Sequence, residues 1–114
     1  MEDNHRKERA NAIIIQAAST FIGRESTNQS LITVTRGDYS KDSRSLTLFI
    51  SVLPAEQEAP ALSFLNRHKH DLFEFIKKTT SLDFIPKIVF IIDAGEKNRQ
   101  RMDELVNEDK KLAQ

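Results

Sequence analysis

One carboxylate of this sequence stands where many nucleotide-hydrolysing and phosphate-accepting domains present a metal ligand. Asp93 ends the stretch "FIPKIVFIID", which is the most apolar run of the chain. A carboxylate in that position can hold a magnesium ion, or it can close a buried strand by accepting hydrogen bonds in a turn or helix cap. A phosphate-binding loop needs several glycines close together, and Gly23, Gly37 and Gly95 lie too far apart in the sequence to form one. The sequence therefore favours the structural role for Asp93, and we expect no enzyme.

The histidines His5, His68 and His70 are the next side chains that can bind a metal ion. Positions 68 and 70 lie about 200° apart around a helix, so their rings can share an ion only where the helix breaks. Asp71 stands three residues after His68 and can join it on one helix face. Such a pair is a weak indication of a metal site, and the chain contains no cysteine for a thiolate site. We therefore expect exposed histidines, with no metal and no other cofactor.

Basic side chains gather at three places along the chain. Each group can neutralise RNA phosphates or can form the solvated face of a helix, and spacing alone leaves both interpretations open. Lys and Arg together number 17, as do Asp and Glu, so an attraction to RNA has to come from local groups and not from the net charge. The candidate RNA-binding residues are Arg6, Lys7 and Arg9, then Arg67, His68, Lys69 and His70, and finally Lys77 and Lys78.

The first element that positions these side chains is a predicted helix over residues 4–22. Asp3 and Asn4 can cap its start, because their side-chain oxygens accept hydrogen bonds from free amide groups of the first turn. Gly23 is the expected stop. Apolar residues at helical spacing predict one buried face, which consists of Ile14, Ala17, Ala18, Phe21 and Ile22.

Two predicted strands follow, and both alternate between two kinds of residue. In the first, Ile32 and Val34 lie on one face and Thr33 and Thr35 on the other. The second is "SLTLFISVLP", which Pro54 ends because proline has no amide hydrogen for the next ladder bond. Its two faces carry Leu46, Leu48, Ile50 and Val52 against Thr47, Phe49 and Ser51. The connection has the composition of a hairpin loop, with Gly37, Asp38, Ser40, Asp42 and Ser43, so we expect an antiparallel pair.

A second helix is predicted from Pro60, which suits a first helical turn. Its apolar stripe of Leu62, Leu65, Leu72 and Ile76 is interrupted at "RHKH", so the helix is expected to break there. Thr79, Thr80 and Ser81 close it, and Pro86 opens the third strand. Ala94 and Gly95 form a break before a short terminal helix with Met102, Leu105 and Val106.

The order of elements predicts an α+β domain: helix, strand, strand, broken helix, strand, helix, with the helices on one face of a three-stranded sheet. We expect one domain over residues 1–114, with an ordered core of about 4–106 and a charged tail of 107–114. The N-terminus lacks the apolar region of a secretory signal, and no apolar run approaches the ~20 residues that cross a bilayer. A cytoplasmic protein without membrane contact is expected.

Several stretches of the chain resemble a known family. They are the first helix "RKERANAIIIQAASTFI", the strand pair "LITVTRGDYSKDSRSLTLFISVLP" and, most specifically, a P-x-I-x-F-x-x-D strand with Pro86, Ile88, Phe90 and Asp93. Val34, Thr35, Ser40 and Asp42 also match a V-T-x-V-x-x-S-x-D pattern. From Arg6 to about Val106, the chain resembles the ribosome-binding factor A family.

The resemblance implies a type II K-homology-like fold and a non-catalytic factor that binds the small (30S) ribosomal subunit. It further implies help in late maturation of the 16S ribosomal RNA, often in cold adaptation. The expected partners are ribosomal RNA and ribosomal proteins, and we expect a monomer. The alternative is a K-homology-like protein-interaction module without direct RNA contact, which the zero net charge and the missing kink glycine favour.

The chain departs from the family's pattern at three positions. The family's broken helix carries an Ala-x-Gly kink, and that kink is placed here at His68-Lys69-His70. Phe73 stands where an arginine is usual, and Gly37 stands where an aliphatic residue is usual. Without the kink glycine the backbone approaches a phosphate less easily, so RNA contacts at the break have to come from side chains.

Overall fold

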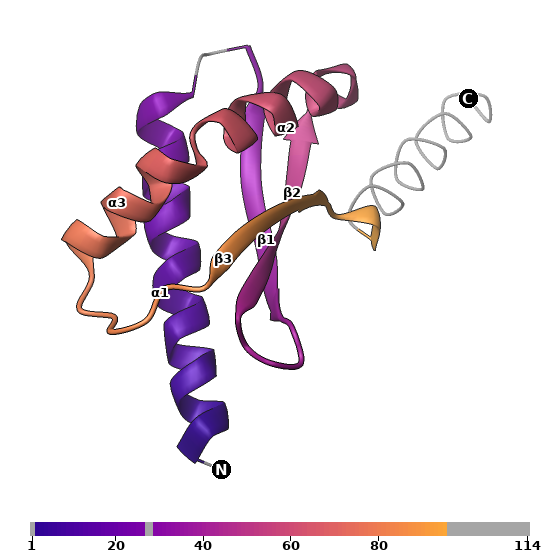
Figure 1. Ribbon diagram of the computed structural model, residues 1–114. Helices are drawn as coiled ribbons and strands as arrows, with labels where there is room; N and C mark the ends of the chain where they lie inside the picture. The colour runs from indigo at the N-terminus through magenta and orange to yellow at the C-terminus, as the bar shows by residue number, and fades with distance from the viewer. Residues whose placement is uncertain (1, 27–28, 96–114) are drawn as a thin grey trace, which may run out of the picture.

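In the part of the chain that the structure describes, the helices lie on one face of a three-stranded sheet (Figure 1). The computed structural model describes residues 2–26 and 29–95. The elements in chain order are helix α1 (Glu2–Glu25), strands β1 (Leu31–Tyr39) and β2 (Ser45–Leu53), the short 3-10 helix η1 (Ala55–Gln57), helices α2 (Glu58–Arg67) and α3 (Lys69–Thr79), and strand β3 (Lys87–Ile92). The predicted α+β class and the order of elements are confirmed. The expected terminal helix with Met102, Leu105 and Val106, and the charged tail, lie outside the described residues.

The sheet has the order β1-β2-β3, with β1 antiparallel to β2 and β2 parallel to β3. The parallel pair requires a crossover, and α2 and α3 supply it. The core lies between the helices and the inner face of the sheet. Its most deeply buried large side chains are Ile14, Leu46, Leu48, Ile50, Leu65, Leu72 and Ile76. The predicted inner faces of α1 and β2 are therefore confirmed.

A bulge in β1 changes the alternation that the sequence predicts. Val34 pairs with Ile50 and Arg36 pairs with Phe49, so Thr35 is the extra residue of the bulge. Ile32 and Val34 pack on the core before the bulge, and Tyr39 packs on it afterwards. After the bulge, the residues that face the core are therefore offset by one position from those before it. A strict alternation of apolar and polar residues cannot predict this offset.

Two glycine predictions need correction. Gly23 does not stop α1, because the helix continues to Glu25 and Gly23 has no positive φ. Gly37 and Asp38 belong to β1 and not to the hairpin loop, which is only Ser40–Arg44. The strand needs a glycine at position 37 because the Asn11 amide of α1 lies against it and donates to the Gly37 carbonyl oxygen at 2.9 Å.

The segments around the prolines agree with the sequence. Pro54 follows the last residue of β2, Pro60 lies in the first turn of α2, and Pro86 directly precedes β3. The long helix ends at Thr79, as predicted. After β3, Asp93 alone separates the strand from Ala94 and Gly95. The prediction that Ala94 and Gly95 form the break is wrong, because the backbone of both residues is helical. Within residues 2–26 and 29–95, no helix has both the length and the apolar character that crossing a membrane requires.

Candidate nucleic-acid interface

The break between α2 and α3 occurs at His68 without a glycine. His68 has φ −102° and ψ 14°, which lies outside the left-handed region. Its amide donates to the carbonyl oxygens of Phe64 and Leu65 at 3.2 and 3.3 Å, and its own carbonyl accepts from the Leu72 amide at 2.9 Å. The backbone therefore changes direction with its hydrogen bonds largely kept. This explains how the chain forms the predicted break although the family's Ala-x-Gly pattern is absent.

The His68 ring is held in place by neighbours on both sides of the break. Its centroid lies 4.6 Å from that of Phe64, and its Nδ1 lies 3.3 Å from Oδ2 of Asp71. His68 is therefore held by residues of both α2 and α3. His70, by contrast, is exposed and borders a hollow to which His68 does not contribute. Among the described residues, no group of three or more His, Cys, Asp or Glu side chains is placed to hold a metal ion.

The break separates Arg67 from the basic residues that follow it. Arg67 borders a hollow of about 180 Å³ that lies along α2, beside the end of α1 and the start of β1. That hollow is otherwise lined by Ser26, Gln29, Ser30, Ile32, Gln57, Pro60, Ala61 and Phe64. Arg67 and Lys69 are only two residues apart in sequence, but they border different hollows.

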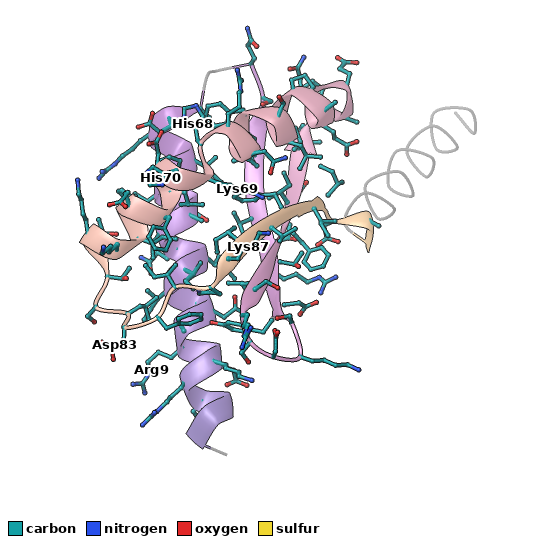
Figure 2. The ribbon with its side chains drawn as sticks, in the orientation of Figure 1. Arg9, His68, Lys69, His70, Asp83 and Lys87 are labelled. Carbon is teal, nitrogen blue, oxygen red and sulfur yellow. The ribbon has the colours of Figure 1, made fainter. Side chains whose placement is uncertain are left out.

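Lys69 and His70 border a second hollow, of about 380 Å³, between the start of α3 and the start of β3. We call it the α3–β3 hollow, and it is lined by Lys69, His70, Phe73, Ile85, Pro86, Lys87 and Ile88. No carboxylate is among these residues, so its charge is positive. Figure 2 shows Lys69 and Lys87 close together over β3, with His70 at the adjoining turn of α3.

Sequence reasoning missed Phe73 and Lys87 as candidate contact residues. Lys87 is a single cation far from the basic runs in sequence, and the crossover places it opposite Lys69. Phe73 stands where the family resemblance predicts an arginine, and in the structure the residue is 38% exposed. A helical wheel marks this position as lying beside the buried Leu72 and Ile76, but it does not indicate the hollow.

The predicted residues Lys77 and Lys78 lie in the last turn of α3, where cations suit the helix dipole. Lys78 borders a hollow that it shares with Arg24 and with the carboxylates of Glu25, Asp71 and Glu74. These carboxylates oppose the approach of a phosphate, so the geometry offers less to RNA here than at the α3–β3 hollow.

The remaining predicted group, Arg6, Lys7 and Arg9, lies near the start of α1. Figure 2 shows Arg9 low on this helix, well away from His68 and Lys69. A helix of 24 residues is about 36 Å long, so α1 can carry basic side chains to a separate part of a large binding surface. The structure does not bring this group together with the break.

Asp93 is placed as a connection within the sheet. Its backbone amide donates to the Ile50 carbonyl at 2.8 Å, and its Oδ2 accepts from the Thr35 hydroxyl at 2.5 Å. Nε of Arg36 lies 3.9 Å from the same oxygen. The residue is 8% exposed. The structural role that the sequence favoured for Asp93 therefore has a defined partner, the bulge residue of β1.

The chain is similar to proteins of one known family over most of its length. The family model described as "Ribosome-binding factor A" matches residues 6–106. A ribosome-binding factor A from Thermodesulfovibrio yellowstonii is 35% identical over 83 residues, which cover 73% of this chain and 70% of that protein. Another, from Kosmotoga olearia, is 26% identical over 103 residues, which cover 90% and 82%.

Solved structures agree in fold. The crystal structure of ribosome-binding factor A from Thermus thermophilus superposes with a TM-score of 0.66 at 22% identity, covering 75% of this chain and 94% of that one. A homology model of the Thermus thermophilus factor, fitted into a cryo-EM map of a 30S complex, gives 0.61 at 22% identity, with coverage of 71% and 88%. With one family model spanning nearly the whole described chain and the same fold in its solved members, the chain belongs to the ribosome-binding factor A family.

Proposed function

We propose that this protein binds the small ribosomal subunit and assists late maturation of its 16S ribosomal RNA without catalysing a reaction. Membership of the ribosome-binding factor A family supports the proposal. The observation that carries it is the α3–β3 hollow, because this surface gathers Lys69, His70 and Lys87 and has no carboxylate among the described residues that line it. In a protein with no net charge, such a local group is what can attract RNA.

The proposed mechanism is recognition of RNA shape together with neutralisation of phosphates. Lys69 and Lys87 make the central contacts, and Arg67 reaches the neighbouring side of the break. Arg6, Lys7 and Arg9 make a second contact, about one helix length away, on an extended RNA surface. Lys77 and Lys78 contribute less because of the carboxylates nearby. On this proposal the protein acts as a single cytoplasmic domain and a monomer.

A second candidate function is protein binding without RNA contact. It is favoured by the outer face of the sheet, where the apolar side chains of Leu31, Leu53 and Ile91 are 63%, 44% and 45% exposed. Salt distinguishes the two candidates. RNA binding weakens steeply as salt rises, because condensed counterions are released, whereas an apolar protein contact does not.

The experiment that tests the proposal is co-sedimentation of purified small subunits with two charge-reversed variants. Lys69→Glu/Lys87→Glu changes the α3–β3 hollow, and Lys41→Glu/Arg44→Glu makes the same change of net charge on the hairpin loop. We expect the first variant to lose most of its binding and the second to bind as the wild type does. Equal binding by both variants would remove the hollow from the contact surface. Thermal unfolding of both variants checks that each remains folded.

A further inference from the structure

We propose that residues 96–114, which lie outside the described part of the chain, dock on the outer face of the sheet and cover its exposed apolar side chains. The inference goes beyond the proposed function, because it assigns an occupant to the face that favours the second candidate function. The side chains that meet are Met102, Leu105 and Val106 of this segment and Leu31, Leu53 and Ile91 of the sheet. While the segment lies there, the face is closed to other proteins.

Three large apolar side chains are exposed on the outer face of the sheet. Leu31, Leu53 and Ile91 are 63%, 44% and 45% exposed. Each stands next to a residue of its strand that packs in the core, so each points to the opposite face. Those core residues are Ile32, Val52 and Phe90. Burial of the three exposed side chains would stabilise the protein, because it removes apolar surface from water.

The exposed side chains lie at the end of the sheet where the chain leaves β3. Leu31 is the first residue of β1 and pairs with Leu53, the last residue of β2. Because β2 and β3 are parallel, β3 ends at the same end of the sheet, directly after Ile91, at Ile92. The described part of the chain stops three residues later, at Gly95. The residues that follow therefore start beside the exposed apolar side chains.

Asp93 shows in which direction the chain leaves β3. As the second residue after Ile91, it lies on the same face of the sheet. Its amide donates to the Ile50 carbonyl on β2 at 2.8 Å, and its Oδ2 accepts from the Thr35 hydroxyl on β1 at 2.5 Å. An aspartate side chain is short, and β1 lies two strand spacings, about 10 Å, from β3. The chain therefore turns over the outer face of β2 towards β1.

A helix begins directly after this turn. The backbone of Ala94 and Gly95 is helical. Glu96 stands three residues after Asp93, which is the spacing of a capping box at a helix N-terminus. The sequence thus favours continuation of the helix into the segment.

The spacing of apolar residues in the segment suits a helix that crosses the sheet. Met102, Leu105 and Val106 recur at helical spacing and give the segment one apolar face. From Gly95 to Met102 a helix rises about 10 Å, which matches the distance from β3 to β1. The apolar face therefore reaches Leu31 at the far strand.

The exposed apolar surface is too small to hold a separate protein by itself. Stable interfaces between proteins bury about 1,200–2,000 Å². On this face the described residues provide three large exposed apolar side chains. A separate protein also loses translational and rotational freedom when it binds, and this loss is much smaller for a segment joined to the sheet at Gly95. The observations therefore favour residues 96–114 over a second copy of the chain or another protein.

The chain contains no cysteine, so pairs of introduced cysteines test the contact directly. We expect Leu31→Cys/Met102→Cys or Leu53→Cys/Met102→Cys to form an intramolecular disulfide under mild oxidation, because a disulfide needs Cα atoms within about 7 Å. Thr47→Cys/Met102→Cys is the matched control. Thr47 lies on the same face of β2 as Leu53, six residues and about 20 Å away. The control pair should form little disulfide under the same conditions.

Thermal unfolding of the full chain gives a second measurement. We expect Leu31→Ser to lower the unfolding midpoint by several degrees, because it removes a covered apolar side chain. Met102→Ser should lower the midpoint by a similar amount, and the double variant by clearly less than the sum. Phe84→Ser is the control, because Phe84 is 62% exposed and lies before β3, away from this face. Its midpoint should hardly change.

Two results would overturn the inference. The first is disulfide formation that is no faster at Leu31 and Leu53 than at Thr47. The second is a disulfide between two chains, seen as a dimer on a non-reducing gel, which would make a second copy the occupant of the face. Small-subunit binding enters neither measurement, so neither result bears on the proposed function.

Discussion

Asp93 joins strands that are not neighbours in the sheet. Its amide continues the hydrogen bonding of β3 to β2 at Ile50, and its carboxylate reaches across β2 to the hydroxyl of Thr35 on β1. The sequence indicated the structural role of Asp93, because its surroundings offered no phosphate loop. The partner could not be predicted, since Thr35 reaches Asp93 from a bulge that a regular alternation does not show.

Replacement of Asp93 tests this connection. A hydrogen bond to a buried charged group contributes about 1.5–3 kcal/mol, so Asp93→Ala should lower the free energy of unfolding by about that amount. Thr35→Val should cost a similar amount, and the double variant should cost clearly less than the sum, with a coupling energy of about 1 kcal/mol. Urea denaturation of the four proteins measures this cycle. Strictly additive losses would mean that the two side chains do not interact.

A second side-chain network holds the hairpin loop. The Ser40 hydroxyl donates to Oδ1 of Asp42 at 2.7 Å, and the Arg44 amide donates to the same oxygen at 3.1 Å. These hydrogen bonds, that from Ser40 first, lower the pKa of Asp42 below the ordinary 3.8. Because the folded state binds this proton less readily than the unfolded chain does, the stabilising effect is present above pH 3.8 and is lost as the pH falls through the folded-state pKa.

Asp42→Asn should therefore reduce the loss of stability in acid. We expect the free energy of unfolding of this variant to fall less than that of the wild type between about pH 5 and about pH 2.5. Ser40→Ala removes the main donor and should flatten the pH dependence in the same direction. Urea denaturation at a series of pH values measures both effects. If the free energy of unfolding of both variants fell in acid as steeply as that of the wild type, the loop would not stabilise the charged form of Asp42.

The secondary-structure elements differ in how completely the sequence specifies them. The periods of apolar residues predict α1, β2 and the interrupted helix, because each of these elements buries one continuous face in the core. The hairpin loop and the end of α1 were placed wrongly because glycine is a common turn residue. Position 37 requires a glycine because of a tertiary contact: the Asn11 side chain of α1 occupies the space that a Cβ atom would need.

Two alanine substitutions test this account of the glycines. Gly23 lies inside α1 with no atom near the position of a Cβ, so Gly23→Ala should stabilise the protein by about 0.5–1 kcal/mol. Gly37→Ala should destabilise it by about 1–3 kcal/mol through overlap with Asn11. Adding Asn11→Ala to Gly37→Ala should recover part of that loss. Thermal unfolding measures the stabilities of these variants relative to the wild type. Stabilisation of the protein by Gly37→Ala would contradict the close approach of Asn11.

The whole molecule combines zero net charge with a local positive surface. The basic runs of the sequence indicated that the broken helix is important, but they did not show how the break divides them. Arg67 and Lys69 border different hollows, while Lys87, distant in sequence, joins Lys69. Such a grouping depends on the parallel β2–β3 pair and its helical crossover, so only the three-dimensional structure reveals it.

The central claim is that this protein acts on the small subunit during its maturation. Sucrose-gradient fractionation of cell extract, followed by immunodetection of the protein, tests it most directly. We predict that the protein travels with free small subunits, is absent from translating ribosomes, and leaves the small-subunit fraction when salt is raised. Sedimentation only with soluble proteins at the top of the gradient, at low salt, would contradict the claim.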